Sequence, residues 1–360
     1  MIKFLPAIIA LVLISIPYPA HAARLFAMGC ETQGQDDAGE WINRGTGTSC
    51  DTTTFRTGAS SLRVAPAAAS NFATVALWSP SNATVTRIET QITSETDLYV
   101  SGYFMITDLP DADVNIFEMQ NSTVPTRVAG INLSTTGVIT AVQADGASVG
   151  TGPTIVINQW WFVNLHVTVS ATVGVVTLQM SPASASATRR PITYVDVSNA
   201  NTGALSINQV RWGSVNASVT MDSYFDDWRG DDAAFPGPGR TALLKSNGNG
   251  NYTAWTGDCT AVDEIPPSAA DNITETTTGE IESCLTDNIT LTTGESIATL
   301  WAISFIVNRS AGLGSPTINM IARDNSVDQT STASEANNAN DRAFGAQFID
   351  SSSGADWTNT

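Results

Sequence analysis

The chain is poor in charged residues, and above all in lysine. Only 14% of its 360 residues are charged, and the lysines are Lys3 and Lys245 alone. Acidic residues outnumber basic ones by 34 to 16, which gives a formal net charge of −18. Proteins that bind nucleic acid neutralise phosphates with clustered lysine and arginine, and this chain has no such cluster. The composition therefore argues against a nucleic-acid partner.

Histidine and closely spaced cysteines are scarce as well. The histidines are His21 and His166, and no C-x-x-C motif occurs among the four cysteines. Zinc sites usually combine such residues at short spacings, so no zinc site is expected. Disulfides are the better interpretation, and they agree with export from the cell. The simplest of the three possible connectivities joins neighbours in sequence, Cys30 to Cys50 and Cys259 to Cys284.

Long apolar runs are missing except at the N terminus. Lys3 precedes an apolar core at Phe4–Ile16, and Ala20-His21-Ala22 fits the small-x-small cleavage rule. Residues 1–22 are therefore predicted to be a signal peptide, and an uncleaved membrane anchor is the alternative. No other run approaches the length needed to span a bilayer. We expect a secreted protein, located outside the cell, on a cell surface or on a virion, with no membrane span after cleavage.

No long helical period occurs anywhere in the chain. Threonine, serine, asparagine and valine are abundant instead, and they favour strands with uncharged polar faces. Alternating patterns and turn residues predict an antiparallel, all-β fold. The predicted strands include Leu25–Met28, Phe72–Trp78, Asp97–Ile106, Val114–Met119, Val128–Leu133, Val138–Val142, Gln159–Val169, Val173–Met180 and Leu205–Trp212.

The stretch Met221–Gly239 organises the rest of the chain. Its first half predicts a strand that places Asp222, Tyr224, Asp226 and Trp228 on one face, and Ser223, Phe225, Asp227 and Arg229 on the other. A buried strand carries acids only where they have partners. Its second half, Pro236-Gly237-Pro238-Gly239, ends the sheet. The predicted division is a first domain at 23–232, a linker at 233–240 and a second domain at 241–360.

Several motifs of the first domain resemble those of the concanavalin A-like jelly rolls, in particular the LamG-like group. Gly29-Cys30-Glu31 stands where the family has Gly-Phe-Glu, and the turn and strand TGASSLRV follow. The hairpin NQWWFVNLHVTVSATVGVVTLQM matches a Trp-led strand pair, and DSYFDDWR stands where the family often has Ile-Asp-Asp-Val. The resemblance implies a concanavalin A-like antiparallel jelly-roll sandwich.

The second domain has a looser resemblance, to small β-sandwich modules found at the ends of phage virion and secreted surface proteins. Strands are predicted within Glu295–Arg309 and at Thr317–Arg323 and Arg342–Ile349. Trp357–Thr360 resembles the approach to another strand, which indicates a chain truncated at its C terminus.

The acids of the closing strand have three interpretations. They form a solvated strand end, which is the commonest setting for a charge cluster, or they are hydrolytic, which no motif supports, or they bind Ca²⁺, a hard ion that takes several oxygen ligands. In sandwich modules that bind carbohydrate, an N-terminal Glu and a closing-strand Asp share a structural calcium. The resemblance places those ligands at Glu31 and at Asp226 or Asp227.

A glycan ligand would stack on exposed aromatic rings. The candidates are Trp78, Tyr103, Trp160 and Trp212. Tryptophan in a β-sandwich is usually a core residue, so burial is the alternative.

Catalytic residues are not assigned. Glycosidases need two carboxylates across a cleft, and the Glu-x-Asp-x-x-Glu run of the glucanases of this fold is absent: Glu95-Thr96-Asp97 begins it, but Tyr99 and Val100 follow. Glu118 is a lone strand acid and is expected to be exposed. His166 lies in an apolar strand and is expected to be a core or edge histidine with its bonds satisfied.

The sequence therefore predicts a secreted, non-catalytic protein that binds a polysaccharide, a cell-surface glycan or another extracellular surface. Two alternatives stay open. One is a structural, adhesion or virion-associated protein, and the other is a glycoside hydrolase. The ligand and the oligomeric state are left open.

Overall fold

The structure is a computed structural model that describes the following residues: 24–31, 43–44, 48–65, 72–76, 94–121, 124, 126–184, 188–213, 219–242, 244–262, 273–274, 280–287, 303–309, 317–318, 321–324, 327–330, 335–336 and 342–348. The predicted signal peptide and Trp78 lie outside this part of the chain. Within it, no helix has the length and hydropathy needed to cross a membrane.

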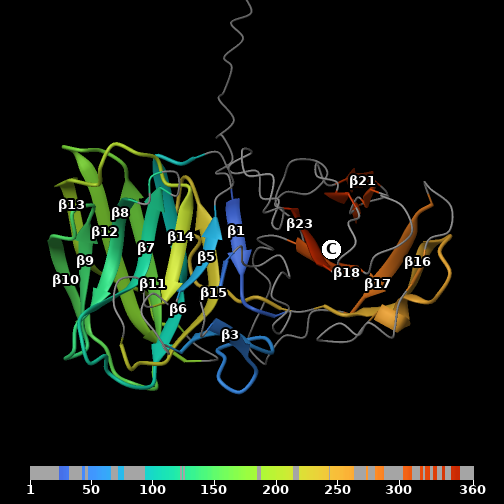
Figure 1. The fold of residues 1–360 in the computed structure, drawn as a ribbon, viewed down its shortest axis with the longest axis horizontal. Helices are drawn as coiled ribbons and strands as arrows, with labels where there is room; N and C mark the ends of the chain where they lie inside the picture. The colour runs from blue at the N-terminus through green and yellow to red at the C-terminus, as the bar shows by residue number, and fades with distance from the viewer. Residues whose placement is uncertain are drawn as a thin grey trace, which may run out of the picture.

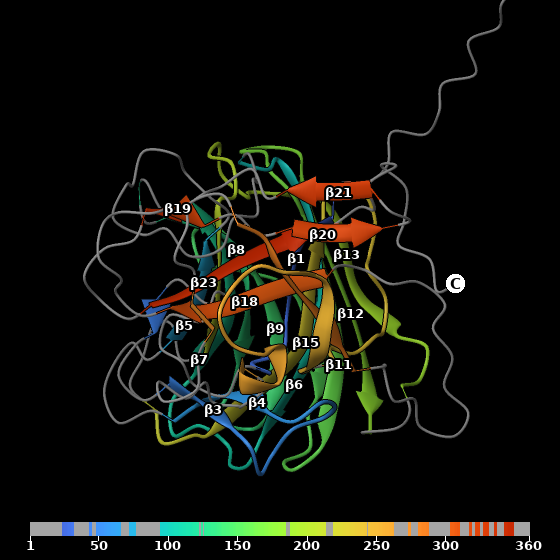
Figure 2. The ribbon, with the colours of Figure 1, turned by 90° about the vertical axis from the view of Figure 1, so that its right-hand side faces the viewer.

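The first domain is a sandwich of two antiparallel sheets, which Figures 1 and 2 show from two sides. Sheet A has eight strands in the order β13-β12-β11-β6-β15-β4-β3, and β1 also pairs with β15. Sheet B has seven strands in the order β10-β9-β8-β7-β14-β5-β2. The all-β, antiparallel fold predicted from the sequence is confirmed.

Where strands were predicted, their bounds agree with the observed ones to within about four residues. In sheet A they are β1 (Arg24–Met28), β3 (Thr48–Asp51), β4 (Ser61–Val64), β6 (Asp97–Ile106), β11 (Trp160–Thr168), β12 (Gly174–Ala183), β13 (Ile192–Ala200) and β15 (Ser223–Asp231). In sheet B they are β2 (Asn43–Arg44), β5 (Phe72–Ala76), β7 (Val114–Asn121), β8 (Thr126–Leu133), β9 (Val138–Gln143), β10 (Ser148–Thr154) and β14 (Gln209–Gly213).

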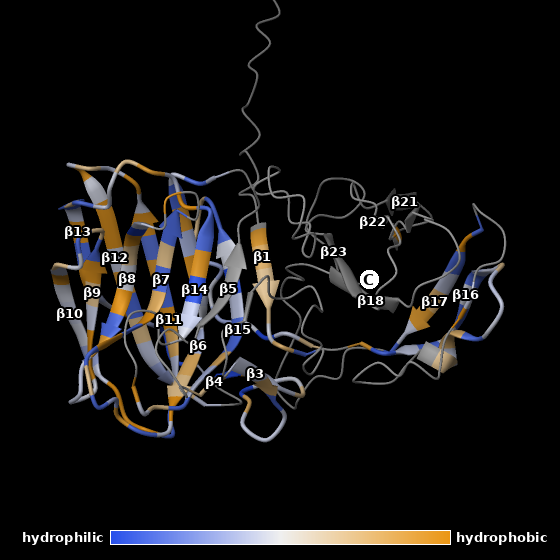
Figure 3. Ribbon diagram, in the orientation of Figure 1, coloured by the Kyte–Doolittle hydropathy of each residue, from blue (hydrophilic) through white to orange (hydrophobic). Residues whose placement is uncertain are grey.

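Four strands of this domain were not predicted, namely β2, β3, β10 and β13. Of these, β10 and β13 end their sheets on the same side of the sandwich. Both are largely exposed, so neither shows an alternating apolar face in its sequence. Edge strands of this kind are formed through backbone pairing with a neighbour, and that pairing leaves little trace in side-chain pattern. In Figure 3, inner strands such as β7 and β14 carry mixed hydrophobic and hydrophilic colour.

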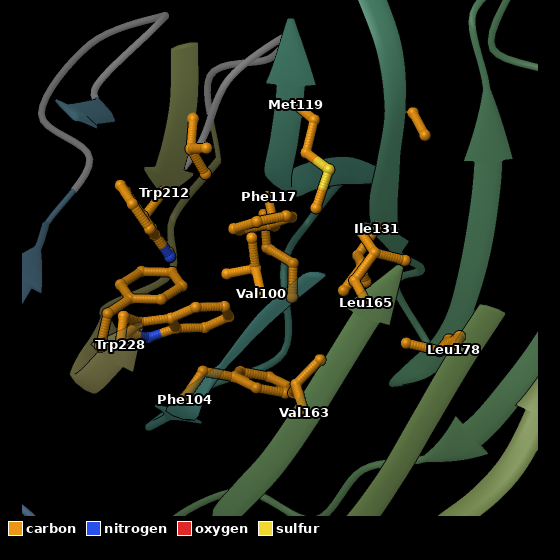
Figure 4. Close-up of a cluster of buried hydrophobic side chains, with 14 of the residues drawn as sticks. Val100, Phe104, Phe117, Met119, Ile131, Val163, Leu165, Leu178, Trp212 and Trp228 are labelled. Carbon is orange, nitrogen blue, oxygen red and sulfur yellow. The ribbon is translucent and has the colours of Figure 1, made fainter. Parts of the chain in front are cut away.

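The core between the sheets is centred on aromatic rings (Figure 4). Phe117 of sheet B stacks on Trp228 of sheet A with ring centroids 5.1 Å apart, and Trp212 meets Trp228 edge-on at 5.6 Å. A Cβ at Gly102 would lie 2.2 Å from the Trp228 ring, so the absence of a side chain on β6 makes room for this indole. Each large ring buries enough apolar area to contribute a few kcal/mol to folding.

A β-bulge in β15 changes which side chains face the core. The register shifts between Asp226 and Arg229, and Asp227 has a positive φ of 55°. Bulges re-aim the residues that follow them. Trp228 therefore packs in the main core, whereas Tyr224 packs with a separate aromatic cluster. The predicted strict alternation, with Trp228 and Tyr224 on one face, is wrong beyond the bulge.

Both predicted disulfides are present. Cys30 is bonded to Cys50 and Cys259 to Cys284, with sequence separations of 20 and 25 residues. Neither bond crosses between the two predicted domains.

Replacing Cys30 and Cys50 together by alanine should lower the free energy of unfolding of the first domain by about 3 kcal/mol, because the unfolded chain gains the freedom of the opened loop. Urea unfolding of the double variant measures this change. Non-reducing peptide maps should show only the two local links. A link between domains in such a map would contradict the structure.

In the second domain, the described residues form four two-stranded antiparallel pairs. These are β16 (Ser246–Thr253) with β17 (Glu282–Thr286), β18 (Ile303–Arg309) with β23 (Arg342–Phe348), β19 (Thr317–Ile318) with β22 (Glu335–Ala336), and β20 (Ile321–Asp324) with β21 (Val327–Thr330). A short 3₁₀ helix, η1, spans Cys259–Val262. The β class is confirmed for this part of the chain, and its closure into a sandwich stays a prediction.

Candidate functional site

The three acids predicted from the resemblance meet at one place in the fold. Glu31 follows β1, which pairs with β15, the strand that carries Asp226 and Asp227. All three side chains are buried, with exposures of 4%, 0% and 0%. The loop between β3 and β4 covers them: Glu31 accepts the N–H of Ala59 at 2.8 Å, and Asp226 accepts the N–H of Arg56 at 2.8 Å. We call these three residues the acid cluster.

Asp227 uses both of its carboxylate oxygens within the protein. Oδ2 accepts from the Arg56 guanidinium at 2.9 Å, and the Thr57 hydroxyl lies within 2.8 Å of both oxygens. Oδ1 also accepts from the backbone N–H and the hydroxyl of Thr241. A carboxylate saturated in this way anchors chain segments, and it has no oxygen left for a metal ion. Asp227 therefore does not fit its predicted role as a ligand.

Asp226 is different, because one of its oxygens is buried without a hydrogen-bond partner. Oδ2 accepts two backbone N–H groups, those of Arg56 and Thr57, whereas Oδ1 has none. Burial raises the pKa of Asp226 well above its ordinary value, and the neighbouring charge of Asp227 adds to the rise. A carboxylate in such a place is stabilised by a proton or by a cation on Oδ1.

As a calcium site, the acid cluster fits in part. Asp226 Oδ1 and the carboxylate of Glu31 supply oxygen, but Ca²⁺ takes six to eight oxygens. The Arg56 guanidinium already offsets part of the negative charge. No group of three or more His, Cys, Asp or Glu side chains suited to a metal ion occurs among the residues that the structure describes. Any calcium here would depend on Glu31, Asp226 and backbone carbonyls.

Asp227 of the acid cluster and two neighbouring arginines form hydrogen bonds with the segment predicted to be a linker. Arg229 donates to the carbonyl of Gly237 at 2.7 Å, and Arg56 donates to that of Gly239 at 3.2 Å. A Cβ at Gly239 would lie 2.0 Å from the Arg229 guanidinium, so a larger residue would require this guanidinium to shift. With Thr241 bound to Asp227, the folded unit extends past residue 232 to at least Thr241.

A chain of residues 23–232 should therefore be less stable than one of residues 23–242. The shorter chain loses the partners that Thr241, Gly237 and Gly239 give to three charged side chains. Since hydrogen bonds to charged groups each contribute about 1.5–3 kcal/mol, we expect a loss of at least about 2 kcal/mol. Urea unfolding of the two chains measures the difference, and equal stabilities would show that the segment is a free linker.

The predicted aromatic platform is not formed by the residues that the structure describes. Trp212 is fully buried in the main core. Tyr103 is fully buried as well, with the Arg56 guanidinium 3.6 Å above its ring and Phe162 at 4.9 Å. Trp160 retains 9% exposure in the same cluster. Tyr103 and Trp212 have no open face on which a sugar could stack, because β15, the loops and the second sheet cover them.

His166 has hydrogen-bond partners, as predicted, and it lies on the interior strand β11 and not at a sheet edge. Its Nε2 lies 2.5 Å from Asp97 Oδ1, and its ring stacks on Tyr99 with centroids 3.8 Å apart. The hydroxyl of Thr168 donates to Asp97 at 3.1 Å and lies 3.3 Å from His166 Nε2. These contacts explain the histidine without catalysis.

A polar network that the sequence analysis missed lies on the outer face of sheet B. We call it the polar row. It consists of Asn115, Glu118 and Gln120 on β7, Arg127 and Asn132 on β8, and Gln209 and Arg211 on β14. The intervening residues Phe117, Met119 and Trp212 point into the core. Part of the signal was present in the sequence, because Glu118 and Gln120 on β7 and Gln209 and Arg211 on β14 are polar residues two positions apart with apolar residues between them.

Glu118 is the centre of the polar row. Its Oε1 accepts from Asn115 at 2.8 Å and from the Nε of Arg127 at 2.7 Å. Asn132 donates to Asn115 at 3.2 Å, and the side-chain amides of Gln120 and Gln209 bond to each other. Glu118 is only 4% exposed, so the expectation of an exposed acid is wrong. A buried carboxylate on a strand is tolerated here because neighbouring strands supply its donors.

The polar row is partly accessible to solvent at its margin, and one position beside Glu118 is occupied by glycine. Arg127, Asn132 and Arg211 are only partly buried, unlike the residues between them. On β8, Gly130 pairs with Glu118, and a Cβ there would lie 2.6 Å from the Phe117 carbonyl. The place beside Glu118 therefore has no side chain of its own.

The described strands that carry the polar row contain a single carboxylate. Glu118 is the only acidic residue in the sequences of the seven strands of sheet B. Glycosidases need two carboxylates on either side of the scissile bond. Amides and guanidinium groups, in contrast, are the donors and acceptors that recognise hydroxyl-rich ligands.

Comparisons with known proteins give only distant likenesses. No family profile and no curated protein matches the chain. Solved structures that match include a sialidase of Trypanosoma rangeli, 11% identical over 51% of this chain and 27% of that one, with a TM-score of 0.32. This chain therefore spans about a quarter of the sialidase.

Two other matches have similar values. An engineered GH43 glycoside hydrolase is 12% identical over 57% of this chain and 40% of its own, with a TM-score of 0.36. The Ca²⁺-bound exoplasmic/lumenal domain of VIP36 is 11% identical over 59% of this chain and 98% of its own, with a TM-score of 0.33. At these values the likenesses assign neither a family nor a function to the chain.

Proposed function

We propose that the protein is an exported, non-catalytic protein that binds a glycan or another extracellular surface through the outer face of sheet B. The observation that supports this most is the polar row, a connected set of amide, carboxylate and guanidinium groups on a sheet face. On sheet A, the β3–β4 loop and the segment after β15 bond to Asp226 and Asp227, so the β15 part of that sheet is covered.

Binding is favoured over hydrolysis by the state of Glu118. It is the single strand acid of sheet B, and it is already bonded to Arg127 and Asn115. A glycosidase acid or nucleophile must be free to exchange a proton or to attack the sugar. The LamG-like affiliation, the secreted location and the β-sandwich nature of the second domain belong to this proposal, and the two disulfides are compatible with it.

Structural calcium at Glu31 and Asp226 is the further part of the proposal. The buried oxygen of Asp226 without a hydrogen-bond partner supports it. Such an ion would join the two ends of the first domain and stabilise it by mass action, by about 2.7 kcal/mol at a hundredfold excess over the dissociation constant. Chelation should therefore lower the melting temperature of residues 23–242, and an unchanged melt would remove calcium from the proposal.

The binding proposal is tested by measuring the mature chain, residues 23–360, against an array of glycans. Asn132→Ala should weaken binding of the retained glycans about tenfold, because this half-buried amide lies at the margin of the polar row. Thr193→Ala is the matched control, since Thr193 is exposed on sheet A and also bonds to one amide. Binding to no glycan, or equal effects of both changes, would contradict the proposal.

The same samples separate binding from catalysis. We expect no release of reducing sugar from the polysaccharides that bind. Release that Glu118→Gln abolishes would establish a glycoside hydrolase and overturn the non-catalytic assignment.

A further inference from the structure

The segment 236–241, which leads from β15 towards the second domain, is bonded to side chains in and beside the acid cluster. Asp227 accepts the backbone N–H of Thr241 at 2.5 Å and its hydroxyl at 2.9 Å. Arg56 donates to the carbonyl of Gly239 at 3.2 Å. The first strand of the second domain, β16, begins soon afterwards. These bonds therefore determine where the chain leaves the first domain.

Arg56 connects Asp226 to this segment through its backbone and its side chain. Its backbone N–H and that of Thr57 donate to Asp226 Oδ2, at 2.8 and 3.2 Å. Its guanidinium donates to Asp227 Oδ2 and to Gly239. Thr57 has the same double role, since its hydroxyl lies within 2.8 Å of both oxygens of Asp227. A shift of this loop relative to Asp226 therefore also changes the bonds of Asp227 and Gly239.

Thr241 also fits closely against the residue that follows β1. That residue is Gly29, and a Cβ added there would lie 1.9 Å from the hydroxyl oxygen of Thr241. The observed position of Thr241 depends on the space that glycine leaves. A larger residue at position 29 should therefore disturb the same contact from the opposite side.

Asp226 and Asp227 are neighbours whose carboxyl groups are both fully buried. The Arg56 guanidinium pairs with Asp227, whereas Asp226 Oδ1 has no hydrogen-bond partner among the described residues. Adjacent carboxylates in a poorly solvating medium repel each other. This repulsion weakens the bonds by which Arg56 and Thr57 hold both of them. A cation on Oδ1 offsets the repulsion and should strengthen those bonds.

We propose that calcium at Asp226 controls how firmly the segment 236–241 is bound to the first domain, and with it the freedom of the second domain. This inference rests on the calcium part of the proposed function. With the ion bound, the β3–β4 loop stays in place, and Arg56 and Asp227 hold Gly239 and Thr241. Without the ion, these bonds should open more often.

Trypsin tests this coupling, because Arg240 lies within the segment. The mature chain, residues 23–360, is digested with calcium or with a chelator, and mass spectrometry follows each cleavage. Cleavage after Arg240 should be at least about fivefold faster with the chelator, which is the lower end of ordinary coupling between two sites. Arg127 of the central strand β8 is the internal control, since cleavage there requires sheet B to open. Its cleavage should change much less.

Coupling is reciprocal, so disturbing Thr241 should weaken calcium binding, which calorimetry of the mature chain measures. Thr241→Val deletes the hydroxyl and should weaken binding at least about fivefold, whereas Thr241→Ser keeps it and should bind as the wild type does. Thr253→Val is the matched control, because it removes a hydroxyl from an exposed position of β16. Thermal melts show which variants are folded, and Gly29→Ala serves if Thr241→Val is not.

The outcomes separate this inference from the proposed calcium site. Calcium binding with no change in cleavage after Arg240, or with an equal rise after Arg127, would overturn the coupling and leave a structural ion. Equal effects of Thr241→Val and Thr253→Val on the affinity would also overturn it. If calorimetry detects no calcium binding, the ion itself is removed from the proposed function and the coupling with it, whereas the glycan array tests the polar row independently.

Discussion

Replacing Arg56 by alanine is expected to lower the free energy of unfolding of the first domain by about 3–5 kcal/mol. Arg56 is only 8% exposed, and its guanidinium lies 2.9 Å from the fully buried Asp227. Removing one partner of a buried ion pair leaves the other charge in a medium that solvates it poorly. Urea unfolding of residues 23–242 measures the loss.

The expected loss is large because Arg56 connects several segments at once. It donates to Gly239 of the segment after β15 and to Thr188 of the loop after β12, and it covers the ring of Tyr103. The backbone N–H of the same residue binds Asp226. Alanine keeps that N–H but deletes every side-chain contact, so the segment 236–241 should also become open to proteolysis.

Arg63→Ala is the control for this experiment. Arg63 of β4 pairs with Asp222, the residue before β15, but the two side chains are 36% and 28% exposed. Exposed ion pairs contribute about 0–1 kcal/mol, because water and salt screen them. If Arg56→Ala costs no more than Arg63→Ala, the acid cluster does not hold the domain together as described.

The acid cluster shows which parts of the candidate site could be predicted from the sequence and which could not. Acids alternating with aromatic residues in one strand predicted that Asp226 and Asp227 need partners if they are buried, and the structure supplies them through Arg56, Thr57 and Thr241. The partners themselves lie about 170 residues away or beyond a Pro-Gly run, and no local pattern connects them. The bulge at Asp227 could not be predicted from the sequence either, because it requires a positive φ that non-glycine residues rarely adopt.

The aromatic platform was predicted wrongly and the polar row was not predicted, and both errors have the same cause. Period two divides a strand into two faces, but it does not say which face another layer covers. Trp212 and Arg211 are neighbours on β14, and only the tertiary fold decides that the ring is inside and the guanidinium outside. Disulfides were easier to predict, because cysteine spacing and the linker position both limit the possible pairings.

The second large effect that we expect is a pH dependence of the free energy of unfolding, caused by Asp226. Its pKa in the folded state is raised by burial and by Asp227, whereas in the unfolded chain it titrates near 4. Its contribution to stability is therefore complete below about pH 4, falls as the pH rises through the folded pKa, and stays low above it. Each unit of difference between the two pKa values corresponds to about 1.4 kcal/mol of lost stability at neutral pH.

Asp226→Asn isolates this effect, because asparagine resembles the protonated carboxyl and does not titrate. Unfolding free energies of wild type and variant should be compared from pH 4 to pH 8 with a chelator present. The other titrating groups are the same in both chains, so their contributions cancel in the difference. Relative to wild type, the variant should become progressively more stable as the pH rises, and a difference that does not change with pH would contradict the raised pKa.

Calcium should act on the wild type in the same pH range and leave the variant unchanged. A cation on Oδ1 replaces the proton that Asp226 otherwise needs, so added Ca²⁺ should restore stability only where the carboxyl has ionised. At pH 4 the ion must compete with the proton and should have little effect. A pH effect without a calcium effect would show that the acid cluster holds a proton alone. A calcium effect that persists in Asp226→Asn would place the ion elsewhere in the chain.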